Sequence, residues 1–199
     1  MGEHRWADGR NVNRNQRFEI RIAGFGGQGV VTIGKILGTA FSIYGGLNSV
    51  NTQSYGPESR GGACRSEVVA SDSEINYPYV RRADVLVALS QVAVDTYLDD
   101  LKEGGILIID PQAIQNVPAA DRFRVFPVPT LAIAHEIGDV KYQNTVVLGA
   151  LYAFIADLIR EPDLAQALRE SVPPATVDRN LAAFEKGKNF ARSTFDLEK

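Results

Sequence analysis

Hydrophobic and polar residues alternate over residues 18–23, which read Phe-Glu-Ile-Arg-Ile-Ala. This period of two is typical of a β-strand. Residues 30–44 come next, with apolar residues at every third or fourth position, the spacing that predicts an amphipathic helix. Between the two patterns lie the glycine-rich residues 24–29. We therefore expect a strand, a glycine turn and a helix in this part of the chain.

The glycine turn reads Gly24-Phe25-Gly26-Gly27-Gln28-Gly29. The spacing Gly24-x-Gly26-x-x-Gly29 is typical of dinucleotide-binding turns, where glycines allow a tight turn, close approach of a ligand and helix-strand packing. The start of the next helix offers unpaired N–H groups and a partial positive charge to an anion such as a phosphate. A glycine turn that packs the strand against the helix without a ligand has the same spacing and stays an alternative.

Two common nucleotide sites are disfavoured by the residues in and after the turn. A nicotinamide site needs an acidic residue at the tip of the second strand, about 20 residues after the last glycine. Residues 47–53 (Leu-Asn-Ser-Val-Asn-Thr-Gln) contain no carboxylate. No Lys-Ser or Lys-Thr pair closes the turn, as a Walker P-loop requires. An anionic ligand of another kind remains possible.

Residues 47–52 predict a second strand, and residues 53–62 a long loop with three glycines and one proline. Connections of this length are often functional. Residues 63–70 alternate as a strand does, and residues 74–77 are predicted to pair with them as a short antiparallel partner.

The rest of the chain predicts further strands and helices. Residues 85–89 and 106–110 are continuous apolar runs, typical of strands covered on both faces, and residues 124–129, with two prolines, suit an edge strand. Helices are expected at 92–101 with a stop at 102–105, at 130–137, at 143–159, and from an N-cap at Thr176 to Asn189. The predicted fold is α/β and Rossmann-like, with a mostly parallel central sheet, helices on both faces and a short antiparallel hairpin. We expect one domain over residues 17–199, which includes C-terminal helices, and a mobile N-terminal tail over residues 1–16 that orders only against a partner.

Composition limits the classes of partner. The chain has 199 residues, 45% of them hydrophobic, and a net charge of −3, so it has no basic surplus for binding nucleic acid. No run of roughly 18 apolar residues suggests a membrane span. One cysteine excludes internal disulfides and cannot supply the four thiolates of an iron-sulfur cluster. We expect a protein of the reducing cytoplasm.

Candidate catalytic residues are few. His135 lies on an apolar helix, where a structural role is favoured over that of a general base. Cys64 begins a strand, and no pattern assigns it a histidine partner. Asp110 ends a central strand, where open α/β sheets place their ligands, but it is equally well placed to cap the next element. The chain is therefore interpreted as a binding domain without its own catalytic residues or metal site.

Several motifs occur in a characteristic order. They are Gly24-x-Gly26-Gly27-Gln28-Gly29-Val30, the loop 53–62, Ser66-Glu67-Val68-Val69, Ile75-x-Tyr77-Pro78, Ala83-Asp84, Ala88-Leu89-Ser90-Gln91 and Asn144-x-x-x-Leu148-Gly149-Ala150. Together they resemble the gamma subunit of the 2-oxoacid:acceptor oxidoreductases, over roughly residues 18–154. This family oxidises pyruvate, 2-oxoglutarate, 2-oxoisovalerate or aryl 2-oxoacids, and the sequence leaves the choice among them open.

The resemblance implies a subunit of a larger enzyme that is not catalytic alone. Alpha and beta subunits would bind thiamine diphosphate and Mg, and a ferredoxin-like subunit would hold [4Fe-4S] clusters. Electrons would pass to ferredoxin or to an NAD-linked subunit, and the acyl group to coenzyme A. The gamma chain would cover the active site and contribute to coenzyme A binding.

The resemblance also implies which residues face coenzyme A: Gly24, Gly26, Gly27, Gln28, Gly29, Tyr55, Gly56, Ser59, Arg60, Gly61 and Gly62. Relatives that act on pyruvate often have lysines in this loop, whereas Glu58 and Ser59 stand here and Arg60 is its only cation. Two alternatives stay open: a free-standing Rossmann-like nucleotide-binding enzyme, and a structural subunit whose turn binds no ligand.

Overall fold

The computed structural model describes residues 4–5, 11–12, 17–55 and 62–197. Its main sheet has six strands in the order β4-β5-β3-β6-β7-β8. The strands are β3 (Phe18–Phe25), β4 (Asn48–Tyr55), β5 (Ala63–Ser71), β6 (Ala83–Ala88), β7 (Leu101–Ile109) and β8 (Arg124–Pro127). β3, β6, β7 and β8 are parallel, and β5 is antiparallel to both β3 and β4. The mostly parallel sheet with an antiparallel hairpin is confirmed.

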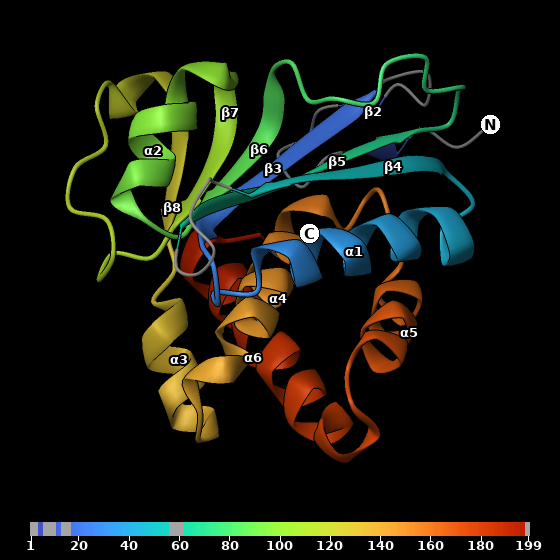
Figure 1. The fold of residues 1–199 in the computed structure, drawn as a ribbon, viewed down its shortest axis with the longest axis vertical. Helices are drawn as coiled ribbons and strands as arrows, with labels where there is room; N and C mark the ends of the chain where they lie inside the picture. The colour runs from blue at the N-terminus through green and yellow to red at the C-terminus, as the bar shows by residue number, and fades with distance from the viewer. Residues whose placement is uncertain (1–3, 6–10, 13–16, 56–61, 198–199) are drawn as a thin grey trace.

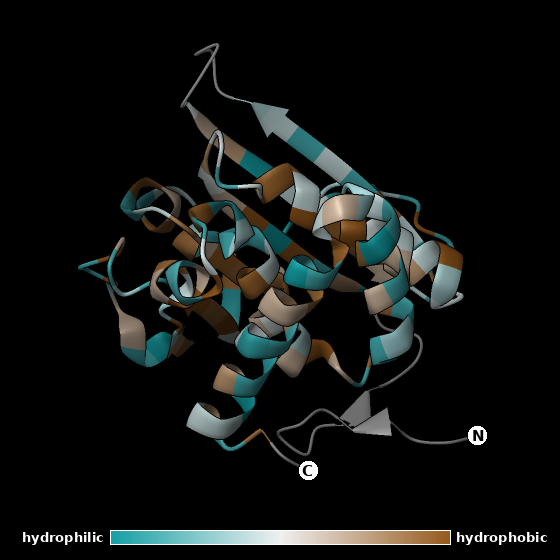
Figure 2. Cartoon of the chain, turned by 90° about the horizontal axis from the view of Figure 1, so that it is seen from below, coloured by the Kyte–Doolittle hydropathy of each residue, from teal (hydrophilic) through white to brown (hydrophobic). Residues whose placement is uncertain are grey.

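Helices cover both faces of the sheet, as predicted (Figure 1). One face packs on α1 (Val30–Thr39), α4 (Gln143–Ile155), α5 (Glu161–Ser171) and α6 (Val177–Phe195), with α3 (Thr130–Ile137) at the side of this layer. The other face carries α2 (Gln91–Tyr97), which packs on β6 and β3. Figure 2 views the helical layer from below and shows hydrophobic and hydrophilic bands alternating along several of its helices, as expected of amphipathic helices, whereas α4 is buried throughout residues 145–155.

The N-terminal residues include one further pair of strands. β1 (His4–Arg5) and β2 (Asn11–Val12) pair antiparallel with each other. Most of the tail predicted at residues 1–16 lies outside the described residues, so its ordering against a partner stays a prediction.

The hairpin differs from the predicted one. Residues 74–77 do not form a strand, and β5 pairs instead with β4, which continues to Tyr55 and so shortens the predicted loop. At the end of the segment 74–77, the guanidinium group of Arg17 donates hydrogen bonds to the backbone carbonyl of Tyr77 and, just beyond it, to that of Tyr79. A side chain satisfies groups that a ladder would otherwise pair.

Other boundaries differ from the predicted ones for local reasons. The glycine pair at residues 104–105 lies inside β7 rather than at a helix stop, and Gly104, at φ +67°, lies where the register against β6 shifts. Helix α5 is not predicted from the sequence, because a proline usually indicates a break in a helix. Pro162 lies in the first turn of α5, where a proline fits. The last helix starts after Thr176 as predicted and continues to Phe195.

Helices α4 and α6 make a close contact through two glycines. A Cβ atom built on Gly187 would lie 2.0 Å from the carbonyl oxygen of Val146, and one on Gly149 would lie 2.0 Å from that of Phe184. The two helices therefore meet backbone to backbone, which fixes the position of α4 under the sheet.

This contact predicts a reversal of the usual effect of Gly→Ala in a helix. Alanine normally stabilises a helix interior by up to about 1 kcal/mol, but Gly187→Ala should lower the free energy of unfolding by about 1–3 kcal/mol because the helices must separate. Urea unfolding measures this. Gly38→Ala in α1 is the control, since among the described atoms its Cβ would meet only Asn51 Cβ, at 3.3 Å. Equal stability of the two variants would contradict the close contact.

Candidate functional site

The glycine turn joins the carboxyl end of β3 to α1, at the end of a parallel strand where α/β folds bind ligands. The backbone N–H of Gln28 donates to the carbonyl of Phe25 at 3.2 Å and closes the turn. Gly27 and Gly29 have φ values of +99° and +73°, a conformation that L side chains rarely adopt. Phe25, Gly26 and Gly27 are exposed, so the tip of the turn is open to a ligand.

The side chain of Gln28 holds this turn in place. Its Oε1 accepts a hydrogen bond from the Phe25 N–H at 2.6 Å, and its Nε2 donates to the carbonyl of Leu89 at 3.0 Å. Gly24 leaves room for it, because a Cβ there would lie 2.5 Å from Oε1. Both ends of the Gln28 amide are therefore committed inside the protein, and the expected contact of Gln28 with a ligand stays a prediction.

The turn and the end of the long loop lie side by side. The Gly26 N–H donates to the carbonyl of Gly62 at 2.9 Å. In the sheet, Cys64 is the register partner of both Gly24 and Tyr55, which places these three residues in one row. Tyr55 is 68% exposed, and its hydroxyl donates to Gln53 Oε1 at 3.2 Å. The remaining predicted loop residues, Gly56, Ser59, Arg60 and Gly61, lie outside the described residues.

Asn144, at the start of α4, is a neighbour of the turn that the predicted site does not include. A Cβ on Gly29 would lie 2.5 Å from Asn144 Cβ and 2.6 Å from its Nδ2, so only a glycine at position 29 admits this side chain. The Asn144 Oδ1 accepts a hydrogen bond from Thr145 Oγ1 at 3.4 Å. Within the described part of the chain its Nδ2 has no acceptor. Asn144 belongs to one of the ordered motifs, but its separation of 115 positions from Gly29 hides the contact in the sequence.

The start of α1 is electrostatically suited to an anion. Gly29 is its N-cap, no side chain among the described residues caps it, and its first turn contains no acidic residue. The first intrahelical bond is that of the Ile33 N–H to the Gly29 carbonyl. The preceding N–H groups and the helix dipole are therefore available to a negatively charged group.

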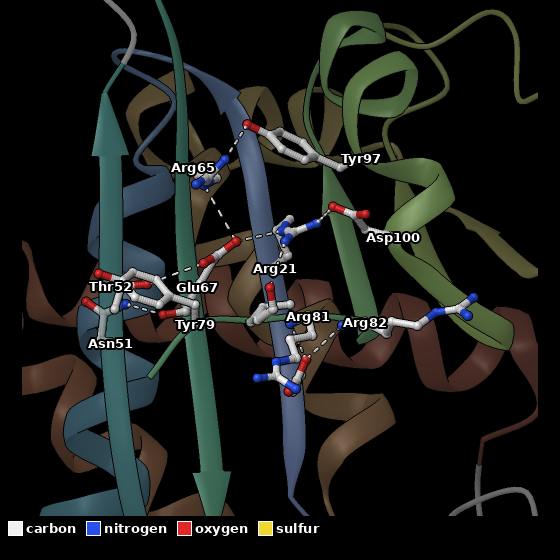
Figure 3. Close-up of polar contacts among 12 residues, drawn as sticks. Arg21, Asn51, Thr52, Arg65, Glu67, Tyr79, Arg81, Arg82, Tyr97 and Asp100 are labelled. Atoms are coloured by element: carbon white, nitrogen blue, oxygen red, sulfur yellow. Dashed lines mark hydrogen bonds and ion pairs between the residues drawn. The ribbon is translucent and has the colours of Figure 1, made fainter. Parts of the chain in front are cut away.

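A network of charged side chains lies on the opposite face of the sheet (Figure 3). Arg21 and Glu67, 4% and 2% exposed, pair at 2.8 Å across β3 and β5. Arg21 also pairs with Asp100 at 2.5 Å, and its guanidinium carbon lies 4.9 Å from the ring centroid of Tyr97. Arg65 donates to the Tyr97 hydroxyl at 3.3 Å.

This network ties α2 to the strands that carry the turn. The alternation in residues 18–23 correctly predicts β3, but the polar face of that strand is buried in ion pairs instead of solvated. Removing one partner of a buried pair leaves an unpaired charge, at a cost of about 3–5 kcal/mol. The network is therefore part of the framework of the site and not an open binding surface.

The other candidate residues have structural positions. The buried carboxylate of Asp110 accepts from Gln112 N–H at 2.9 Å, from Leu131 N–H at 2.9 Å and from Thr130 Oγ1 at 2.6 Å, and so caps α3. Burial raises the pKa of the Cys64 thiol, which keeps it protonated at neutral pH. His135 is exposed near the end of α3.

Metal-binding and membrane-spanning features are both absent from the described residues. These residues contain no group of His, Cys, Asp and Glu arranged to hold a metal ion. None of the helices that they form combines the length and apolarity needed to cross a bilayer.

The fold and the turn define a class: an α/β binding domain that presents a glycine turn at the carboxyl end of its first sheet strand. Comparison with known proteins shows to which family this binding domain belongs. Residues 19–190 match the family model of pyruvate ferredoxin/flavodoxin oxidoreductase. The chain is 48% identical over 178 residues to the 2-oxoglutarate synthase subunit KorC of Methanothermobacter thermautotrophicus, covering 86% of this chain and 94% of that protein.

Solved structures that are similar to this chain indicate the same family. The gamma subunit of a keto/oxoacid ferredoxin oxidoreductase from Geobacter sulfurreducens is 36% identical, with a TM-score of 0.81 over 89% of this chain and 98% of that chain. The 2-oxoglutarate:ferredoxin oxidoreductase of Magnetococcus marinus, with 2-oxoglutarate, coenzyme A and succinyl-CoA bound, is 26% identical, with a TM-score of 0.80 over 89% of this chain and 31% of that chain. The chain therefore belongs to the pyruvate ferredoxin/flavodoxin oxidoreductase family, as a gamma-type subunit of a multi-subunit 2-oxoacid:ferredoxin oxidoreductase.

The contact between Gly29 and Asn144 predicts that substitutions at Gly27 and Gly29 lower the free energy of unfolding by different amounts. Gly27→Ala and Gly29→Ala both impose a left-handed conformation on alanine, which costs about 1–2 kcal/mol. Gly29→Ala should lose about 1–3 kcal/mol more, because its methyl group collides with Asn144, whereas a Cβ on Gly27 meets no described atom within 4 Å. Urea unfolding of both variants measures the difference. The packing claim is wrong if the two lose equal stability.

Proposed function

We propose that this chain covers the active site of its oxidoreductase and binds coenzyme A between the glycine turn and the loop that follows β4. The observation that carries the proposal is the hydrogen bond from the Gly26 N–H to the Gly62 carbonyl, which joins the two segments beside the open start of α1. Coenzyme A is an anion with three phosphate groups, and such a helix start suits a phosphate. The similar M. marinus enzyme has coenzyme A bound.

Each neighbouring group has a place in this proposal. The first N–H groups of α1 receive a phosphate, and the amide of Asn144 donates a further hydrogen bond. Tyr55 offers an exposed ring on which an adenine base stacks. Gln28 keeps the turn in the shape that makes these contacts possible. Arg60 supplies the cation of the loop.

The redox cofactors belong on other subunits in this proposal. One cysteine, Cys64, is available in the whole chain and it is buried, so its residues do not fit a [4Fe-4S] cluster. The described residues offer no metal site for the Mg of thiamine diphosphate either. We therefore assign thiamine diphosphate to alpha and beta subunits, the clusters to a ferredoxin-like subunit, and electron acceptance to ferredoxin or an NAD-linked subunit. We place the assembly in the reducing cytoplasm, where the free thiol of Cys64 is compatible with its surroundings.

The substrate class is a 2-oxoacid, converted to an acyl-CoA by oxidative decarboxylation. 2-Oxoglutarate is the substrate to test first, since the relative at 48% identity is a 2-oxoglutarate synthase subunit. A ketoisovalerate oxidoreductase subunit is 35% identical, so branched-chain 2-oxoacids are the matched comparison.

The experiment that tests the proposal separates the two halves of the reaction. A charge-assisted hydrogen bond shielded from water contributes about 1.5–3 kcal/mol, and about 1.4 kcal/mol is one factor of ten. Arg60→Ala in the assembled enzyme should therefore raise the KM for coenzyme A roughly ten- to a hundredfold at low salt, and less at high salt. Steady-state kinetics measures the first effect. Stopped-flow reduction by the 2-oxoacid without coenzyme A should be nearly unchanged.

Arg122→Ala provides the control. Arg122 pairs with Glu103 and Asp99, none of which belongs to the glycine turn or to the loop after β4, so both half-reactions should keep their rates. An intact Arg60→Ala enzyme with normal KM for coenzyme A would exclude the phosphate contact. Equal damage to both half-reactions would instead favour a loop that only maintains the shape of the complex.

A further inference from the structure

A second exposed surface lies at the opposite end of β3 from the glycine turn. The segment between β5 and β6, residues 72–82, runs past the start of β3, whereas the turn comes after its end (Figure 1). It contains the motif Ile75-x-Tyr77-Pro78, which the proposed coenzyme A site does not use. We name its exposed part, formed by Tyr77, Tyr79, Arg81 and Arg82, the Tyr77–Arg82 surface.

Two charged side chains fix the backbone beneath this surface. Glu19 is 5% exposed, and its Oε2 accepts from the N–H groups of Arg81 and Arg82 at 2.8 and 3.1 Å. Arg17 pairs with Glu19 and donates to the carbonyl of Tyr79 at 2.6 Å and to that of Tyr77. The segment is irregular, yet its backbone is held by hydrogen bonds from the Arg17–Glu19 ion pair. A surface fixed in this way loses little conformational entropy when a partner binds.

The surface presents residue types that dominate protein interfaces. Tyr77 and Tyr79 are 41% and 52% exposed, with ring centroids 5.5 Å apart in an edge-to-face arrangement. The guanidinium carbon of Arg81 lies 4.3 Å from the ring centroid of Tyr77. Tyrosine and arginine are enriched among residues that carry binding energy at interfaces. Beside them is a hollow of about 370 Å³ lined by Glu74, Ile75, Tyr77 and Arg81 among others.

The guanidinium groups of Arg81 and Arg82 are available to carboxylates of a partner. Two nearby carboxylates are committed elsewhere, since Asp84 pairs with Lys102 at 2.6 Å and Glu103 with Arg122 at 2.6 Å, whereas Glu74 lines the hollow without an ion pair among the described residues. Among the described residues, no carboxylate forms an ion pair with Arg81 or Arg82. Two cations therefore face solvent on a chain whose net charge is −3. They favour a partner that presents carboxylates.

Charge disfavours two other occupants of this surface, a second copy of the chain and the chain's own N-terminal residues. A second copy docked around a two-fold axis would set the same arginines against each other. The N-terminal residues 1–16 contain Arg5, Arg10 and Arg14 but only Glu3 and Asp8, so they are basic as well. In the M. marinus enzyme the region similar to this chain is 31% of a longer chain, so there it is continuous with other parts of the enzyme.

We propose that the Tyr77–Arg82 surface docks on another subunit of the oxidoreductase, through an acidic segment whose carboxylates pair with Arg81 and Arg82. Docking at this end leaves the glycine turn free at the other end of β3. The inference rests on the assembly part of the proposed function and is independent of coenzyme A binding.

The first arm of the test measures association of the full chain with the thiamine-binding and cluster subunits encoded by the same source. The chain carries an affinity tag and is co-expressed with them, either as wild type or as the double variant Arg81→Glu, Arg82→Glu. The variant should recover at least tenfold less of the partner, and raising the salt concentration should weaken the wild-type association. Arg179→Glu on α6 is the matched control, because it reverses one exposed arginine on a different face. It should associate as wild type does.

The second arm uses no charge reversal, so it tests the inference even where the double variant misfolds. A photoreactive phenylalanine analogue replaces Tyr79, and the cross-linked peptide is identified by mass spectrometry. We expect a peptide of another oxidoreductase subunit that contains Asp or Glu. Cross-links to a second copy, or none in the assembled enzyme, would overturn the inference, as would full association of a folded double variant. A wild-type chain that assembles with no subunit contradicts the proposed function itself.

Discussion

The amide of Gln28 is the interaction on which the rest of the site depends. It binds the glycine turn through the Phe25 N–H and the residue that directly follows β6 through the Leu89 carbonyl. The backbone bonds of the turn among the described residues are those of Gln28 N–H to Phe25, Gly26 N–H to Gly62 and Ile33 N–H to Gly29, and none of them joins the turn to β6. By fixing the turn to β6, Gln28 sets where the N-terminus of α1 points and where Gly26 meets the loop. The shape of the turn is thus determined by a side chain and not by glycines alone.

The two faces of the sheet have different structural roles. The face covered by α1, α4, α5 and α6 is an apolar layer that supports α1 and the glycine turn, whereas the face covered by α2 carries the Arg21–Glu67–Asp100 network. Along β3, the ligand end and the end that holds the Tyr77–Arg82 surface are separated by the eight residues of the strand. A domain of this design can be held by a partner at one end while its turn and loop meet a ligand at the other.

The sequence predicts well those features that depend on local patterns. The strand, turn and helix over residues 18–39, the helix at Thr130–Ile137 and the edge position of β8 follow from period, glycine spacing and proline. The contacts of the site could not be predicted, because they join distant residues. Asn144 meets Gly29 only after α4 has packed on α1, and Gly26 bonds to Gly62 only after β5 has paired with β3.

Long-range satisfaction of polar groups explains the errors as well. The pattern of residues 74–77 predicts a strand, but Arg17, which directly precedes β3, bonds the carbonyl groups of Tyr77 and Tyr79. Asp110 has two predicted roles, and only the tertiary structure, which brings Thr130 and Leu131 to it, decides for the cap. A single sequence cannot show which distant partner satisfies a polar group.

Amide hydrogen exchange in the assembled enzyme, with and without saturating coenzyme A, tests the central claim most directly. We predict that coenzyme A slows exchange in peptides that cover the turn, the first turn of α1 and the loop after β4, because their N–H groups become bonded and covered. Residues 74–82 at the other end of the sheet should exchange at an unchanged rate. Unchanged exchange in the turn and loop of an enzyme that turns over with coenzyme A would contradict the claim that this chain binds it.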